Sequence, residues 1–295
     1  PAVMLPVVSE QGGTGGRGRA LGEFNSLRSV GFAAGQLGAG VLLGLASWTE
    51  IFLVLAAVNA LGTLAAVFVV DPTDTGETAP TAANVLAEAR RRLLPAADDR
   101  AHLTESGLHW VYLAVLLEAL TFMGILSLAP VYLTETVGVS ELVMGAFLAL
   151  NPASRTLTMY VFGRVVDAVG RTPVLVGGMV GTAAFAVVLG LATVPATLAG
   201  RQVVTGVAFL VIAAAYAATT IGSQSFIGDV ADVDRESELM GLHSTAIGLG
   251  GILGPGLLGV LVGLAGHTVA FVALGAFSLS GVLAVGRAVE PGHGG

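Results

Sequence analysis

The sequence contains no cysteine and no lysine, and it has few charged residues of any kind. Of its 295 residues, 11% are charged and 54% are hydrophobic. Without cysteine the chain can form no disulfide, no thiolate metal site and no cysteine nucleophile. A water-soluble domain is about one quarter charged, so a chain this apolar cannot cover a water-facing surface. The composition therefore predicts that lipid surrounds most of the chain.

The motifs of several common enzyme classes are also missing. The chain has no P-loop, no His-Glu-x-x-His pair and no Gly-x-Ser-x-Gly turn. Thirteen basic residues on a chain with a net charge of -7 do not favour nucleic-acid binding. We therefore expect no enzymatic activity, no cofactor, no metal site and no nucleic-acid partner.

Long apolar runs take the place of these motifs. A helix of about 20 apolar residues crosses the hydrocarbon core of a bilayer, whereas an open sheet edge in lipid leaves costly unpaired backbone groups. The sequence thus predicts an all-α membrane protein with eight transmembrane helices. Their expected ranges are 24–46, 50–70, 108–133, 142–162, 173–193, 198–221, 241–263 and 267–288.

The arginines predict how these helices are oriented. They gather in or beside alternate loops, and Arg201 is the one near the opposite side. Positively charged loops stay in the cytoplasm, so we expect a multi-pass protein of the cell membrane whose arginine-rich loops and C-terminus are cytoplasmic. The arginines on that side are Arg17, Arg19, Arg28, Arg90, Arg91, Arg92, Arg100, Arg164, Arg171, Arg235 and Arg287.

A polar connection divides the chain. Residues 71–107 separate a first part, 1–70, from a second part, 108–295, and 81–94 is expected to form an amphipathic helix. Two interpretations remain open for this helix. It is a solvated linker between two bundles, or it lies on the anionic inner leaflet.

The first two and the last two runs are related by a repeat. When the chain is shifted by 219 residues, Gly22, Gly31, Gly35, Gly40 and Gly44 align with Gly241, Gly250, Gly254, Gly259 and Gly263. Internal repeats of one orientation are typical of secondary transporters, and glycines of this kind let helices pack closely. Residue 1 aligns with Thr220, so we expect an intact protein of twelve spans, whose first four precede this sequence.

Two motifs resemble those of the major facilitator superfamily. The segment 163–171, with Gly163, Arg164, Asp167, Gly170 and Arg171, is similar to the conformational motif between the second and third helices of a half. Gly22, Gly31 and Gly35 resemble the motif that the family's exporters carry, although Gln36 stands where the family has proline. The resemblance implies the last two helices of an N-terminal half and a complete six-helix C-terminal half of a twelve-helix fold.

The same resemblance implies secondary active transport of a small solute by alternating access. Proton-coupled export is the leading expectation, and it makes the lipid bilayer, a small-molecule solute and protons or another cation the partners. Uptake or uniport, and a non-transporting sensor or scaffold with the same fold, remain as alternatives.

Glu118 and Arg155 are charged residues that lie deep within apolar runs. Charge inside a membrane is costly and marks a functional candidate, and both Glu118 and Arg155 lie about 12–15 Å from the cytoplasmic face. We expect them to pair in a central cavity, with Glu118 as a proton or cation site; the alternative is a buried pair that fixes helix packing. His243 is expected to be a packing or interfacial residue rather than a proton relay. Further candidates for the solute path, each alternatively an interhelical hydrogen-bond partner, are Asn151, Tyr112, Gln36 and Tyr216.

Overall fold

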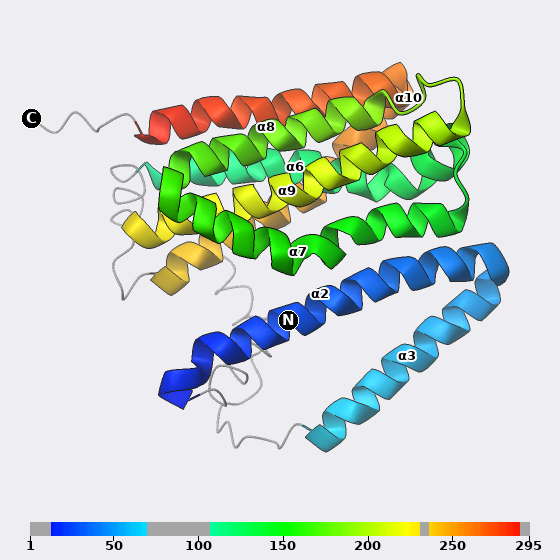
Figure 1. The fold of residues 1–295 in the computed structure, drawn as a ribbon, viewed down its shortest axis with the longest axis horizontal. Coiled ribbons are helices and arrows are strands. Elements are labelled where there is room, and N and C mark those ends of the chain that lie inside the picture. The colour runs from blue at the N-terminus through cyan, green and yellow to red at the C-terminus, as the bar shows by residue number, and fades with distance from the viewer. Residues whose placement is uncertain (1–12, 70–106, 231–235, 290–295) are drawn as a thin grey trace, which may run out of the picture.

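The computed structural model describes residues 13–69, 107–230 and 236–289, and these residues form helices and short connections with no strand. Figure 1 shows a bundle made by the segments from α6 to α10, beside which the two N-terminal helices lie. The segment expected to carry an amphipathic helix, 81–94, lies outside the described residues.

The N-terminal helices are α2 (Gly13–Leu45) and α3 (Trp48–Val69). Ser47 and Glu50 begin α3 with a capping box: the Ser47 amide donates to Glu50 Oε2 at 2.7 Å, and the Glu50 amide donates to Ser47 Oγ at 3.4 Å. The described side chains of α3 are almost all exposed, and α3 diverges from α2 in Figure 1. This apolar helix therefore has little packing of its own within the described residues.

The bundle begins with α6 (Leu108–Val131), which continues into a π-helical segment, η1 (Tyr132–Val137). Pro130 lies just before that change, at a position where proline removes a backbone hydrogen bond. Helix α7 (Glu141–Val169) follows, and the Ser140 side chain caps it by accepting from the Val143 amide at 3.4 Å. Gly170, with φ at 88°, ends α7 and allows the sharp reversal into α8.

The remaining helices are α8 (Arg171–Gly190), α9 (Leu198–Val230) and α10 (Glu236–Val289). Helix α10 is broken at Gly266, where φ is 76°, so it contains two consecutive spans. Each of the eight expected runs thus corresponds to one helical segment of the described chain. The prediction of an all-α membrane fold with eight helices is confirmed.

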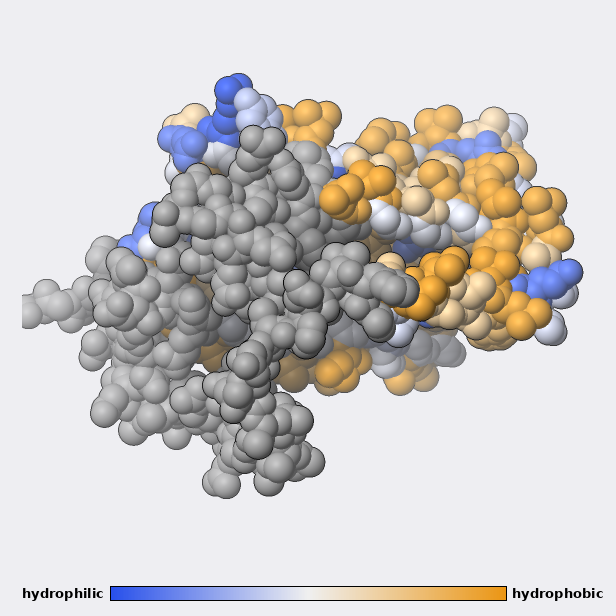
Figure 2. Space-filling model, turned by 90° about the horizontal axis from the view of Figure 1, so that it is seen from below, coloured by the Kyte–Doolittle hydropathy of each residue, from blue (hydrophilic) through white to orange (hydrophobic). Residues whose placement is uncertain are grey.

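Length and hydropathy identify five of the described segments as candidate membrane spans, and the last of them, Leu239–Val289, holds both arms of α10. Large apolar side chains remain exposed on these segments, among them Leu253, Val260 and Leu283. On the face drawn in Figure 2, the described residues that are not covered by grey atoms carry hydrophobic side chains in several places. A surface of this kind fits contact with lipid chains on several sides.

Close backbone contact joins α6 to α10. A Cβ atom on Gly250 would lie 2.7 Å from the Leu116 carbonyl oxygen, and one on Gly124 would lie 2.9 Å from the Gly254 carbonyl oxygen. The buried Thr121 hydroxyl reinforces this packing by donating to the Leu274 carbonyl at 2.7 Å. Small residues thus bring these two helices together, as they do in other membrane bundles.

A second close contact joins α2 to α7. It lies near the C-terminal end of α2 and the beginning of α7, which Figure 1 shows side by side. A Cβ atom on Gly145 would lie 2.7 Å from the Gln36 carbonyl oxygen. The N-terminal helices are therefore attached to the bundle through α7.

Candidate functional site

Polar side chains from four helices gather inside the otherwise apolar bundle. Glu118 of α6 is 5% exposed, and its Oε1 accepts a hydrogen bond from the buried Thr182 hydroxyl of α8 at 3.2 Å. Thr219 and Ser223 of α9 and His243 of α10 are also buried. The α-helical period brings Thr219 and Ser223, four residues apart, onto one face of α9. The bundle interior therefore contains a carboxyl group, an imidazole and several hydroxyls.

Ser223 connects α9 to α10 within this group. Its Oγ lies 2.7 Å from the Thr219 carbonyl oxygen and 2.9 Å from Nε2 of His243. A hydroxyl has one proton to donate, so it can donate to the carbonyl while Nε2–H donates to Oγ, or it can donate to an unprotonated Nε2. Both arrangements need only a rotation of the hydroxyl hydrogen.

Between Glu118 and His243 the bundle leaves a cavity of about 20 Å³. Such a volume is enough for one water molecule, which needs about 10–15 Å³ and two to four polar partners. The residues that line the cavity are Val115, Glu118, Ala119, Phe122, Met123, Tyr216, Thr219, Thr220, Ser223, His243 and Ile247.

Arg155 has a different partner from the one that the sequence predicted. Its Nη2 donates to the Tyr216 hydroxyl, and its guanidinium carbon lies 4.7 Å from the centre of the Tyr216 ring. No ion pair joins Arg155 to Glu118, so the predicted pairing is wrong. The Glu118 carboxyl of α6 contacts Thr182 of α8, whereas Arg155 of α7 contacts Tyr216 of α9, so the two charged groups face different helices.

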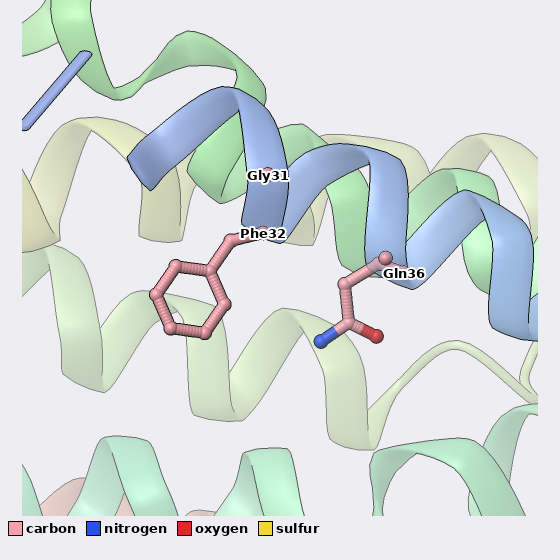
Figure 3. A pocket seen from close by; sticks show the side chains of 4 residues that line it. Gly31, Phe32 and Gln36 are labelled. Atoms are coloured by element: carbon pink, nitrogen blue, oxygen red, sulfur yellow. The ribbon is translucent and has the colours of Figure 1, made fainter. Parts of the chain in front are cut away.

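The other predicted path residues lie in separate places. The Tyr112 hydroxyl donates to the Leu239 carbonyl at 3.0 Å, linking α6 to the beginning of α10. The amide nitrogen of Asn151 is buried without a hydrogen-bond partner among the described residues. Gln36 and Phe32 project from the same side of α2, where with Gly31 and Gly35 they line an open pocket of about 420 Å³ (Figure 3).

A comparison with protein families decides the wider assignment. The family model described as Major Facilitator Superfamily matches residues 2–150 and 111–294, which together span nearly the whole chain. The chain belongs to the Major Facilitator Superfamily. A search of curated proteins found no match. The chain is therefore a multi-pass membrane transporter. Membership of this family does not indicate the substrate, the coupling ion or the direction of transport.

The structure places the residues that resemble the superfamily's conformational motif around the α7–α8 turn. Arg171 pairs with Asp229 at the end of α9, and its guanidinium carbon lies 4.6 Å from the centre of the Phe226 ring. Arg164 lies over the Tyr160 ring at 4.8 Å. Asp167 is exposed near the end of α7, and no described residue forms an ion pair with it. Arg171 of the motif thus contacts the end of α9 beside the turn.

The glycines singled out in the repeat have different surroundings in its two copies. Gly250 and Gly254 pack against α6, whereas nothing lies within 4 Å of a Cβ atom on their counterparts Gly31 and Gly35. Gly22 lies in α2. The same residue type at matched positions therefore meets a helix in one copy and open space in the other.

Sequence reasoning missed the polar group around the cavity. It discounted His243 and did not single out Thr182, Thr219 or Ser223. A lone hydroxyl in an apolar run carries no strong signal, because serine and threonine often bond their own helix. The available signal was their similar depth on adjacent helices: Ser223 and His243 each lie seven residues from a helix end at the same side of the bundle.

Proposed function

We propose that this protein is a secondary active transporter that exports a small organic solute by alternating access in exchange for protons. The superfamily membership supports transport. The observation that carries proton coupling is the position of Glu118, a carboxyl group buried in a membrane bundle. Its partner is one neutral hydroxyl, and no described cation lies within ion-pairing distance.

Ionisable residues inside a membrane are expensive, and they commonly serve ion or proton pathways. A carboxylate buried for a purely structural role would be expected to have a cation beside it. Glu118 lacks such a cation although Arg155 is only one helix away in the chain. Reversible proton binding would explain why a carboxyl group without a neighbouring cation is buried at this position.

The contact between α2 and α7 supports a rocking motion. The two helices touch at the end that carries Glu141, while the α2 face at Gly31 and Gly35 is open. We infer from the positions of the arginines that the closed end is extracellular and that the open end faces the cytoplasm. The parts 1–70 and 108–295 would then be the two bodies that move against each other.

Two alternative functions can be weighed against specific observations. Uptake or uniport would use the same fold, and the pattern of Gly22, Gly31 and Gly35 is the reason to favour export. A sensor or scaffold would not need the open pocket on α2, whose volume of about 420 Å³ is that of a small-molecule site.

The experiment is a proton-flux measurement with the protein in proteoliposomes that contain a pH-sensitive dye. A pH gradient is imposed, and small organic cations, anions and neutral solutes are added in turn. We expect one class of solute to drive proton movement, and we expect Glu118→Gln to reduce that movement by at least tenfold. The matched control is Glu135→Gln, which removes an exposed carboxylate.

Three outcomes separate the alternatives. Proton movement that survives Glu118→Gln would exclude this residue as the coupling site. Solute movement without protons would indicate a uniporter or another coupling ion. No movement of any solute, in protein shown to be folded, would favour a sensor or scaffold.

A further inference from the structure

We propose that the cavity between Glu118 and His243 is a two-group proton site that binds one water molecule between the carboxyl group and the Ser223–His243 pair. The proposal deepens the proposed function, on which it rests for its role in transport. The binding site itself can be tested without any transported solute.

The first support is the clustering of hydrogen-bonding groups. Two hydrogen bonds here join buried side chains from different helices, one between Thr182 and Glu118 and one between Ser223 and His243. Other buried hydroxyls of the bundle, such as those of Thr121 and Ser278, donate to backbone carbonyls instead. The cavity is thus a place where side chains with exchangeable protons face one another.

The second support is the size and lining of the cavity. Its volume of about 20 Å³ exceeds what one water molecule needs and is too small for an organic solute. Apolar side chains, including Val115 and Ile247, form much of the wall. A water held there would have Glu118 on one side and the Ser223–His243 pair on the other, which gives it polar partners.

The third support is position along the bundle. His243 lies seven residues after the start of α10, and Glu118 lies ten residues after the start of α6. At 1.5 Å per residue these are depths of about 10 Å and 15 Å from the same side of the bundle. His243 is therefore nearer to the arginine-rich side, on the way to Glu118.

The proton transfer is balanced within these groups. A proton leaves a protonated His243 imidazole, passes through the Ser223 hydroxyl and the water, and binds to the ionised Glu118 carboxylate. The products are a neutral imidazole and a neutral carboxyl group, and the reverse transfer restores the starting state. For the relay, Nε2–H of His243 donates to Ser223 Oγ, which lies 2.9 Å away, while the Ser223 hydroxyl turns from the Thr219 carbonyl to donate its own proton to the water.

Few other titratable groups face this site. Helix α9 contributes Tyr216 to the cavity wall, and α7 contributes Arg155, which contacts Tyr216. Helix α8 contributes the neutral Thr182. Among the described residues no other acidic group lines the cavity, so a change in the charge of Glu118 should shift the titration of His243.

The test follows the imidazole of His243 by nuclear magnetic resonance in the whole protein, with labelled histidine, in lipid nanodiscs. The chain has five histidines, and the variant His243→Gln assigns the signal. We expect Glu118→Gln to lower the titration midpoint of His243 by on the order of one pH unit, because the variant removes a carboxylate that lines the same cavity and favours the protonated imidazole. Glu135→Gln, the same change on an exposed side chain, should leave the midpoint where it is.

Two further variants test the route between the two groups. Val115→Ile adds one methyl group to the cavity wall and should weaken the coupling by displacing the water. Ser223→Ala removes the hydroxyl beside Nε2 and should do the same. The matched control is Thr205→Val, which removes another buried hydroxyl of α9 that does not line the cavity. Thermal unfolding of each variant confirms that it is folded.

An unchanged midpoint in Glu118→Gln would overturn the proposal, and so would an imidazole of His243 that does not titrate. Failure of the proposed function looks different. Coupling between the two groups without any solute-driven proton flux would leave the proton site standing and remove its role in transport. Flux that depends on Glu118, with no coupling to His243, would leave the transporter standing and remove this site.

Discussion

Gly40 of α2 and Gly145 of α7 meet backbone to backbone. A Cβ atom on either residue would lie 3.0 Å from the Cα atom of the other, and one on Gly40 would also lie 2.5 Å from the Glu141 carbonyl oxygen. Real Cβ atoms do not approach backbone so closely. The contact between the two parts of the chain therefore depends on these two positions having no side chain.

Gly40→Ala should separate α2 from α7 at this contact. Added atoms in a tight contact cost about 1–3 kcal/mol, and 1.4 kcal/mol is tenfold in an equilibrium. We expect solute transport in proteoliposomes to fall about tenfold or more. Gly38→Ala is the matched control, because nothing lies within 4 Å of a Cβ atom on Gly38. Equal activity of the two variants would show that the contact has no part in transport.

The same contact can be locked with a disulfide. A Cβ atom on Gly44 would lie 4.0 Å from the Glu141 Cβ, a spacing that suits a disulfide. We expect the double variant Gly44→Cys/Glu141→Cys to crosslink on mild oxidation, and we expect transport to stop until the bond is reduced. The native chain has no cysteine, so each single-cysteine variant is a background-free control.

Two results would contradict this account of the contact. Failure to crosslink would mean that α2 and α7 do not approach here in the membrane. Crosslinking without loss of transport would mean that the helices need not separate at this end during the cycle.

The number of helices was predictable because bilayer thickness fixes how long an apolar run must be. Their limits were predicted less well: α2 begins at Gly13 instead of 24, and α9 ends at Val230 instead of 221. Which face of each helix packs against a neighbouring helix was not predictable. Glu118 and Arg155 lie at similar depths on consecutive helices, yet Glu118 contacts Thr182 and Arg155 contacts Tyr216. In a span that is apolar on all sides, sequence does not show which side meets a neighbour, because lipid and protein suit the same residues.

The repeat shows the same limit. Its register aligns Gly31 with Gly250, but only Gly250 lies against another described helix. What a glycine does depends on the helix opposite, and that partner is set by the packing of the whole bundle. The polar cavity around Glu118 was missed for a similar reason, since the residues that line it come from three helices far apart in the sequence, α6, α9 and α10.

The contact between α10 and α6 gives a prediction about stability. Gly250→Ala would place a Cβ atom 2.7 Å from the Ala119 Cβ and from the Leu116 carbonyl oxygen. We expect a loss of about 1–3 kcal/mol in the free energy of unfolding, measured in detergent micelles. Gly259→Ala, on the same helix and with nothing within 4 Å, should leave this free energy unchanged or raise it slightly. A larger loss of unfolding free energy in Gly259→Ala than in Gly250→Ala would show that α6 and α10 do not approach each other this closely.

The ion pair between Arg171 and Asp229 should contribute little to stability. Its side chains are 31% and 64% exposed, and exposed pairs are worth about 0–1 kcal/mol. We expect Asp229→Asn to lower the free energy of unfolding by less than about 1 kcal/mol, with a smaller effect at high salt. A larger loss would show that the turn at Gly170 is held mainly by this pair.

The contact between Arg155 and Tyr216 should be worth more, because it lies within the membrane-spanning part of the bundle. Tyr216→Phe keeps the ring over the guanidinium and removes the hydroxyl that accepts from Nη2. The loss of this acceptor leaves the Arg155 Nη2 donor without a partner inside the bundle, which costs about 1–3 kcal/mol in the free energy of unfolding. A double-mutant cycle with Arg155→Gln should give a coupling free energy of about 0.5–3 kcal/mol. The control is Tyr160→Phe, whose exposed ring lies beside Arg164. Additive effects of Arg155→Gln and Tyr216→Phe would mean that the two side chains do not support each other, and Arg155 would then need another partner in the membrane.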